Sequence, residues 1–412
     1  MMGMMGDTGM DPTQGALSGV RILDFSHIAA GPYGTMQLAY FGADVIKVES
    51  RLRPDGWRIR DGNSHIEASR PFADHNKNKR GLTLDLKTEA GRELALRLVA
   101  TADVVVDNFS VGVMERLGLG REALWAVKPD LVIVSIPGLG SVGPHSEWVT
   151  WGPSLMPLSG LTYLWSYPNE EEPVGSQTSY PDYVVGVHVA VLILAALFAR
   201  DRDPVGQWID VAQSEVTASL VGPALTQYLG SGEDAEPEGN GHPFWFPHGC
   251  YPCAGQDRWC FIACPDDEAW AGLCTVMGFG EGAQNPEFAT ASGRRAHRDA
   301  VDRAIGRWTA SLAVDEVVAA CQAHRVPAAM VANGQDLLND PQLAAREMLV
   351  DTKHPFLPGL MLPGPAILLS LTPGGVWRHA PLLGQDNETI LLEVLGLSTE
   401  EIAAYQEAGA FE

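Results

Sequence analysis

Strands and amphipathic helices alternate over residues 20–136, and this alternation constrains the fold of the chain more than any other feature. Residues with helical spacing lie between short apolar runs that suit buried strands, which occupy residues 20–25, 44–49, 82–86, 103–109 and 131–136. A strand, a helix and a second strand predict parallel pairing with a right-handed crossover. We therefore expect an α/β fold, with a doubly wound, mostly parallel, Rossmann-like sheet in a large domain.

Composition divides the remainder of the chain. We expect a disordered tail over residues 1–16 and the large α/β domain over 17–228. A stretch rich in glycine and glutamate at 230–239 indicates a linker. After it, a predicted hairpin, two helices and a strand favour a smaller α+β domain over 229–335. The C-terminal segment 336–412 is expected to return to the large domain.

The charge balance limits the partners. Acidic side chains number 51 and basic ones 28, which gives a formal net charge of −23. Such a surface repels nucleic-acid phosphates and anionic membranes, so we expect neither as a partner. An anionic ligand would need local cations. Residues 51–70 concentrate arginines, which form either a solvated loop or an anion-binding patch: Arg51, Arg53, Arg58, Arg60 and Arg70.

Cysteine usage and the N-terminal residues favour a reducing, cytoplasmic location. The chain has six cysteines, and its first residues lack the basic and apolar regions of a signal peptide. Cys250 and Cys253, followed by Cys260 and Cys264, raise the alternative of a zinc site. The two pairs lie closer together than the roughly 15–20 residues of a zinc ribbon. We therefore expect buried thiols and no metal.

The longest apolar run covers residues 183–198 and includes Gly186 and His188. It is shorter than the roughly 20 residues that a membrane-spanning helix needs. We expect a helix buried in the core, with His188 inside.

Two common sites of α/β proteins are absent from the sequence. No Gly-x-Gly-x-x-Gly follows the first predicted strand, and there is no Walker sequence, so a nicotinamide dinucleotide or a nucleoside triphosphate is poorly supported. Neither Ser135 nor Ser159 lies in a Gly-x-Ser-x-Gly turn, which argues against an α/β-hydrolase.

Asp182 is the candidate chemical residue. It follows Pro181 at the start of the long apolar run. Proline suits the first helical position, and an acidic side chain there faces unsatisfied N–H groups and the positive end of the helix dipole. This setting favours an ionised carboxylate. The local pattern is compatible either with an ordinary helix start or with a functional carboxylate.

Several blocks of the chain resemble class III CoA-transferases, a group that includes formyl-CoA transferase and carnitine CoA-transferase and has α-methylacyl-CoA racemases as relatives. The blocks occur in the same order as in that family and extend from about residue 17 over nearly the whole chain; they are residues 19–32, 41–49, 78–87, 107–118 and 381–386. The resemblance implies an interlocked homodimer, and a heteromer is an alternative.

The resemblance also implies site residues and a substrate. Asp182 falls on the family's nucleophile, which forms aspartyl anhydride and aspartyl-CoA thioester intermediates. A coenzyme A thioester would be a substrate, with succinyl-CoA as the donor that the family suggests, and no cofactor would be permanently bound. The positions matching family contacts to CoA are Ile28, Ala29, Leu84, Lys87, Asn108, Phe109 and Arg116. Among these, Lys87 and Arg116 could pair with phosphates.

Two departures from the family pattern bear on the substrate. Residues 239–247 are bulkier and more aromatic than the glycine-rich lid of formyl-CoA transferases, which favours a larger acyl group. Trp148, Trp151 and Trp165 suggest a bulky or aromatic acceptor. Racemases carry a catalytic histidine and an aspartate where this chain has Trp151 and Gly152, so a transferase is favoured. A racemase and a non-catalytic subunit remain alternatives.

Overall fold

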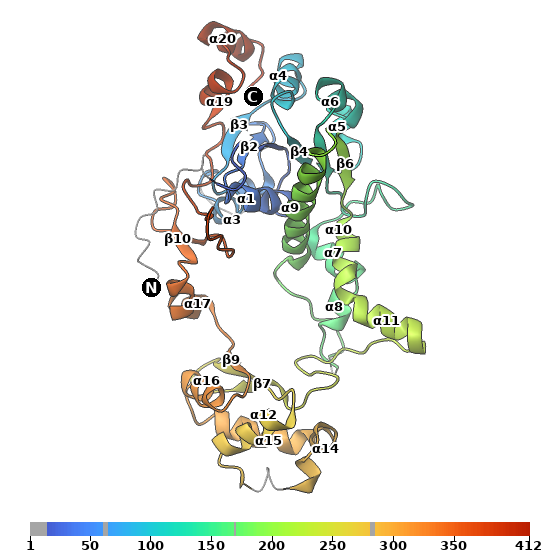
Figure 1. Ribbon diagram of the computed structural model, residues 1–412, viewed down its shortest axis with the longest axis vertical. Coiled ribbons are helices and arrows are strands. Elements are labelled where there is room, and N and C mark those ends of the chain that lie inside the picture. Colours follow the sequence, from blue (N-terminus) through green and yellow to red (C-terminus); the bar gives the residue numbers. More distant parts are fainter. Residues whose placement is uncertain (1–14, 61–64, 169, 281–284) are drawn as a thin grey trace. The chain divides into compact units, whose positions relative to one another are not determined.

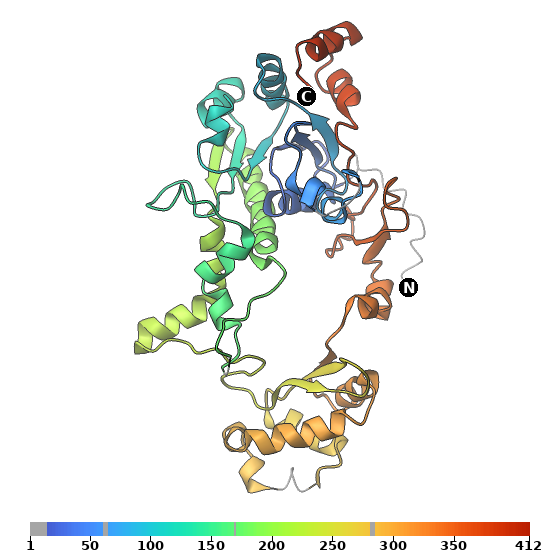
Figure 2. The same cartoon turned by 180° about the vertical axis from the view of Figure 1, so that it is seen from behind.

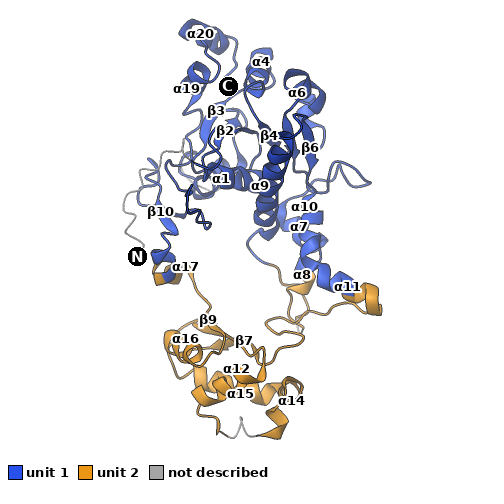
Figure 3. Cartoon of the chain, in the orientation of Figure 1, with its two compact units in different colours: residues 1–161, 176–226, 342–412 blue, residues 162–175, 227–341 orange. Residues whose placement is uncertain are grey.

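The computed structural model describes residues 15–60, 65–168, 170–280 and 285–412. Most of the predicted N-terminal tail therefore lies outside the described residues. The chain forms two compact units (Figure 3). Unit 1 comprises residues 1–161, 176–226 and 342–412, and unit 2 comprises 162–175 and 227–341.

Unit 1 is built on a six-stranded parallel sheet, which confirms the predicted doubly wound α/β fold (Figure 1). The strand order is β3-β2-β1-β4-β5-β6. The strands are β1 (Arg21–Asp24), β2 (Asp44–Glu49), β3 (Arg80–Thr83), β4 (Val104–Asp107), β5 (Val132–Ser135) and β6 (Gln207–Asp210). After β3 the chain crosses to the other half of the sheet and forms β4 beside β1, so the direction of the strand order switches between β1 and β4. Ligands of such sheets bind at this switch point, outside the carboxyl ends of the strands.

Helices cover both faces of the sheet (Figures 1 and 2). Successive strand residues point to opposite faces, so Leu23 and Val105 join one core cluster while Ile22 and Val104 join the other. The first cluster includes side chains of α4 (Glu89–Val99), α6 (Arg121–Val127), α19 (Asn387–Glu393) and α20 (Thr399–Glu407). The second includes α1 (Ala30–Ala39) and α9 (Tyr180–Arg200).

Helix α9 packs closely against α1 through two glycines. A Cβ on Gly34 would lie 2.7 Å from the Gly186 carbonyl oxygen, so neither position has room for a side chain. The opposite face of α9 is exposed and includes His188, so the prediction that His188 lies in the core is wrong. Apolar runs cannot show which side of a helix is covered.

By length and composition alone, α9 could cross a membrane, and 39% of its most apolar window is buried. A helix that supplies one face to a protein core meets the same criterion. One such helix is therefore weak evidence for a membrane span.

Between β5 and α9, residues 137–179 contain two short helices, α7 (Gly152–Leu158) and α8 (Leu161–Leu164). Pro153 lies in the first turn of α7, where proline is tolerated. The backbone N–H of Trp151 donates to the hydroxyl of Ser154, which supports this helix start. Further short helices of unit 1 are α2 (Gly56–Arg60), α3 (Arg70–His75), α5 (Val113–Arg116) and α10 (Gln213–Ala218), which continues through a 3-10 turn (Ser219–Val221) into α11 (Gly222–Ser231).

Unit 2 has its own core around a three-stranded antiparallel sheet. Its strands are β7 (His248–Pro252), β8 (Trp259–Ala263) and β9 (Ala328–Met330). Its helices, in chain order, are α12 (Asp267–Val276), α14 (Ala291–Ala296), α15 (Arg298–Thr309), α16 (Val314–Ala323) and α17 (Gly334–Leu338). A 3-10 turn lies at Pro286–Phe288. After α18 (Pro341–Ala345), a hairpin of β10 (Leu349–Asp351) and β11 (Met361–Pro363) belongs to unit 1.

Candidate active site

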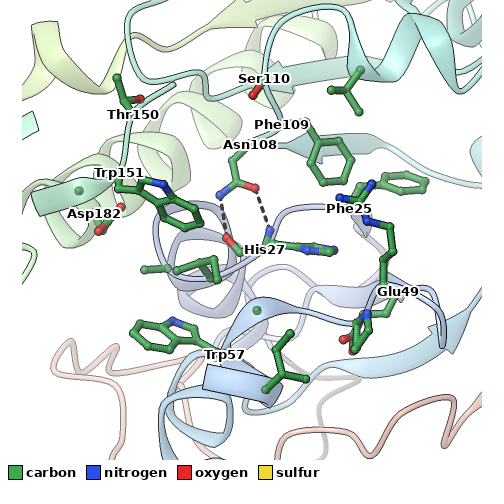
Figure 4. Close-up of a pocket in the computed structure, with 18 of the residues that line it drawn as sticks. Phe25, His27, Glu49, Trp57, Asn108, Phe109, Ser110, Thr150, Trp151 and Asp182 are labelled. Atoms are coloured by element: carbon green, nitrogen blue, oxygen red, sulfur yellow. Dashed lines mark hydrogen bonds between the residues drawn. The ribbon is translucent and has the colours of Figure 1, made fainter. Parts of the chain in front are cut away.

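A cavity of about 1390 Å³ lies within unit 1, with lining residues from the loops that follow β1, β2, β3 and β4 and from the start of α9 (Figure 4). It lies at the switch point that the strand order defines. Most of the predicted site residues line it, namely Ile28, Ala29, Leu84, Lys87, Asn108, Phe109 and Asp182. Arg116 does not line this cavity.

Asn108, in the loop after β4, is hydrogen-bonded to the loop after β1. Its side-chain oxygen accepts from the backbone N–H of His27 at 2.8 Å, and its amide nitrogen donates to the His27 carbonyl at 2.7 Å (Figure 4). Both polar atoms of the Asn108 side chain are thus engaged by the loop after β1. Asn108 shapes the cavity by fixing that loop. The neighbouring Phe109 meets the His27 ring edge-on at 5.5 Å, and burial lowers the pKa of this imidazole.

The loop after β1 is held in a strained conformation. Ile28 has φ of +68°, which a β-branched residue rarely adopts. Its backbone N–H donates to both carboxylate oxygens of Asp55, at 3.0 and 3.1 Å. Asp55 also accepts from the buried Lys47 ammonium at 2.8 Å, and Lys47 donates to the Ser26 carbonyl. A buried ion pair therefore supports the cavity floor where Ile28 and Ala29 lie.

The arginine-rich segment contributes less free charge than its sequence suggests. Arg58 is buried and pairs with Glu49 at 2.9 Å and with Glu67 at 2.6 Å, so it is already neutralised. Arg53 lines the cavity, as does Lys87. The side chain of Arg60 lies outside the described part of the structure. Sequence alone could not reveal that Glu49, at the end of a buried strand, pairs with Arg58.

Asp182 lies in the first turn of α9, which begins at Tyr180, so Pro181 occupies the second helical position rather than the first. The hydroxyl of Ser179 donates a short hydrogen bond to Asp182 Oδ2. Gly152, the first residue of α7, lies directly against both side chains. A Cβ on Gly152 would overlap Asp182 Oδ2 and Ser179 Oγ and would lie 3.0 Å from Asp182 Cγ.

Electrostatics around Asp182 differ from the expectation. Burial raises the pKa of Asp182 above its usual range, and the hydrogen bond from Ser179 offsets only part of that effect. The prediction that the helix start would favour the ionised form is therefore outweighed by desolvation. A poorly solvated carboxylate beside a cavity is suited to nucleophilic attack.

Several lining residues were not singled out from the sequence as site residues. Ser179, Thr150, Trp57, Tyr183 and Gln213 all line the cavity. Only Ser179 carried a local signal, because a serine three residues before an acidic residue is a usual helix start. Tyr183 is next to Asp182 in α9. Trp57, Thr150 and Gln213 come from separate segments, and the fold alone brings them to the cavity.

The cysteines all belong to unit 2, whereas the residues that line the cavity belong to unit 1. All six are free thiols, and burial raises the pKa of five of them, including Cys260 and Cys264. Within the described ranges, no group of three or more His, Cys, Asp or Glu side chains could hold a metal ion.

Comparisons with known proteins agree on one family. Residues 17–387 match the model of CoA-transferase family III. A probable CoA-transferase of Mycobacterium tuberculosis is 35% identical over 93% of this chain, which spans only 49% of that relative's length. Succinyl-CoA–D-citramalate CoA-transferase of Chloroflexus aurantiacus is 31% identical, with 95% of this chain and 96% of that protein covered.

A solved structure is similar as well. The crystal structure of a CAIB/BAIF family protein from Brucella suis superposes with a TM-score of 0.85 at 32% identity, covering 92% of this chain and 99% of that one.

Proposed function

Since the chain belongs to CoA-transferase family III, we propose that it transfers CoA from an acyl-CoA donor to a carboxylic acid, with Asp182 as the nucleophile. One observation carries this proposal. The Asp182 carboxylate lies in the same cavity as six of the seven residues that match family contacts to CoA, and it is desolvated there.

The proposed reaction has four steps. The Asp182 carboxylate attacks the donor thioester, the carbon–sulfur bond breaks, and a mixed anhydride forms as CoA thiolate leaves. The thiolate attacks Asp182 Cγ and releases the donor acid, which leaves an aspartyl-CoA thioester. The acceptor carboxylate displaces the thiolate from Cγ and forms a second anhydride. The thiolate then attacks the acceptor acyl carbon and restores the Asp182 carboxylate. Each intermediate requires exclusion of water.

CoA would lie along the cavity from its nucleotide end to Asp182. Leu84 and Phe109 offer apolar contact, while Lys87 offers a cation for a phosphate. The resemblance suggested Arg116 as a second phosphate contact, but Arg116 does not line the cavity, whereas Arg53 does. We assign the second phosphate contact to Arg53.

The donor and acceptor follow from relatives and from the cavity wall. Two relatives are named as succinyl-CoA CoA-transferases, for D-citramalate and for mesaconate, and a third as succinate–glutarate CoA-transferase. Succinyl-CoA is therefore the proposed donor. Trp57 and Trp151 line the cavity, and Gly152 next to Trp151 touches Asp182. Aromatic walls beside the nucleophile favour an acceptor with a bulky apolar part.

The test is transfer by the purified chain and two matched variants. CoA thioesters would be separated by chromatography after incubation with succinyl-CoA and a panel of acids. Asp182→Asn keeps the shape but removes the nucleophile, so transfer should fall by at least about a thousandfold. Glu89→Gln removes another acid from a helix first turn, at α4, and should keep wild-type activity. Transfer that survives in Asp182→Asn would refute the proposal.

Two alternatives make distinct predictions. A racemase would exchange the α-hydrogen of a 2-methylacyl-CoA for deuterium without moving CoA, yet Trp151 offers no base. A relative from Chloroflexus aurantiacus is named as the alpha subunit of succinyl-CoA–L-malate CoA-transferase, so a heteromer is the second alternative. In that case activity would appear only after a second protein is added.

We propose an interlocked homodimer in the cytoplasm. Light scattering from the purified chain at the monomer mass of 44.3 kDa would contradict the dimer.

A further inference from the structure

Ser179 occupies the N-cap position of α9, but its side chain does not cap the helix. It precedes α9, but its side chain accepts no hydrogen bond from a backbone N–H of the first turn. A serine at this position usually accepts from the N–H three residues later, while an acidic residue there bonds back to the serine N–H. Ser398 at α20 shows that usual arrangement with Glu401. At α9 the two side chains bond to each other instead.

This bond makes the two oxygens of Asp182 unequal. Oδ2 accepts from Ser179, and Gly152 packs against the bonded pair. Oδ1 accepts no hydrogen bond from any residue that the structure describes. Asp182 and Ser179 both line the cavity. The arrangement leaves Oδ1 for attack on a substrate and holds Oδ2 in place.

We propose that Ser179 is a catalytic hydrogen-bond donor, which stays on Asp182 Oδ2 and stabilises the negative charge that develops there when Cγ is attacked. This inference rests on the proposed function, because it assigns a role within the same reaction.

The electron balance explains why Oδ2 matters. When the CoA sulfur bonds to Cγ of the anhydride, the π pair of the Cγ–Oδ2 bond moves onto Oδ2. It returns as the Cγ–Oδ1 bond breaks and the donor acid leaves as a carboxylate. Attack of the acceptor carboxylate on the thioester places the same charge on Oδ2 before the thiolate leaves. Removal of one such donor typically slows an acyl transfer about 10²- to 10³-fold.

The variants are Ser179→Gly and Ser179→Thr. Glycine is tolerated at a helix cap, so the first removes the hydroxyl with little effect on folding. We expect kcat to fall about 100-fold while KM for the acyl-CoA changes less than about threefold, because the hydroxyl acts after binding. Threonine keeps the hydroxyl and should restore most of the rate.

Ser398→Ala is the matched control. Its hydroxyl accepts from the Glu401 N–H, so its loss should lower the melting temperature by roughly 2 °C and leave kcat unchanged. Ser179→Gly should instead lower kcat and leave the melting temperature nearly unchanged. It should also move the acid limb of the rate profile to higher pH, because the Ser179 hydrogen bond lowers the pKa of Asp182.

The outcomes separate the two proposals. If wild type forms a CoA adduct on Asp182 and Ser179→Gly keeps kcat within about threefold, the role of Ser179 is overturned while the proposed function stands. If wild type forms no adduct with any donor and transfers no CoA, the proposed function itself fails.

Discussion

Asp182 combines a helix start with burial beside a cavity, and the second property determines the direction of its pKa shift. Its pKa lies above the ordinary range because the charged form is poorly solvated. The sequence predicts that Asp182 lies at the start of a helix, as observed, but it also predicts that the helix dipole dominates. Desolvation depends on what packs around the side chain, including Gly152 from a separate segment, and no local pattern near residue 182 contains that information.

The raised pKa sets the pH dependence. The proposed reaction needs the carboxylate, so the single-turnover rate of adduct formation should rise with pH through a midpoint above the roughly 3.9 of an unperturbed aspartate. The same shift means that the charged group destabilises the fold above that midpoint. Asp182→Asn should therefore melt at a higher temperature than wild type near neutral pH. The difference should vanish below the unfolded-state pKa. Equal melting temperatures at pH 7 would contradict the shift.

Gly152 should tolerate no side chain. In Gly152→Ala the added Cβ overlaps Asp182 Oδ2 and Ser179 Oγ, so the carboxylate must move. We expect transfer to fall at least about 100-fold, since small displacements of a reacting group have effects of that size. Gly222→Ala is the control, because nothing lies within 4 Å of its added Cβ. A crystal structure of Gly152→Ala with Asp182 unmoved and full activity would be incompatible with this account.

Among the elements, the loop after β1 is predicted to depend on Asp55. Asp55→Asn keeps an acceptor for the Ile28 N–H but leaves the buried Lys47 without its counterion. Breaking a buried pair in this way costs about 3–5 kcal/mol in the free energy of unfolding. Glu268→Gln breaks a surface pair with Arg325, whose side chains are 81% and 88% exposed, and should cost about 0–1 kcal/mol. Urea denaturation of both variants measures the difference.

The Asp55 contribution should depend on pH in a defined direction. Interaction with Lys47 lowers the pKa of this carboxyl below its unfolded value although burial opposes the shift. Its stabilisation is therefore present above the unfolded-state pKa, roughly 3.9, and is lost as pH falls through the lower folded-state pKa. A gap between wild type and Asp55→Asn that widens on acidification would contradict the assignment.

The close packing of α1 against α9 should make a glycine-to-alanine change there destabilising. Alanine favours helices over glycine by about 1 kcal/mol, so Gly306→Ala in α15, with open space around it, should stabilise unit 2. In Gly186→Ala the added Cβ would lie 2.8 Å from the Ala30 carbonyl, and the helices must separate. Gly186→Ala should lower the melting temperature in spite of its better propensity. Thermal unfolding should show a raised melting temperature for Gly306→Ala and a lowered one for Gly186→Ala. A raised melting temperature for Gly186→Ala would be inconsistent with the close packing.

At the scale of the whole molecule, alternating strands and helices were sufficient to predict the parallel sheet, but not its switch point. The strand order and the cavity at that point required the fold itself. The burial of Arg58 against Glu49, the exposure of His188 and the helix at Gly152 could not be read from the chain, because each depends on packing between segments far apart in sequence. Composition likewise predicted the net charge of −23 but not where Lys87 and Arg53 lie.

The most direct measurement is peptide mass spectrometry of the purified chain after incubation with succinyl-CoA and rapid quenching. We expect a covalent CoA adduct on the peptide that contains Asp182, absent from Asp182→Asn and discharged when an acceptor acid is added. An adduct on a different residue, or transfer of CoA by Asp182→Asn, would contradict the central claim that Asp182 carries the acyl and CoA groups.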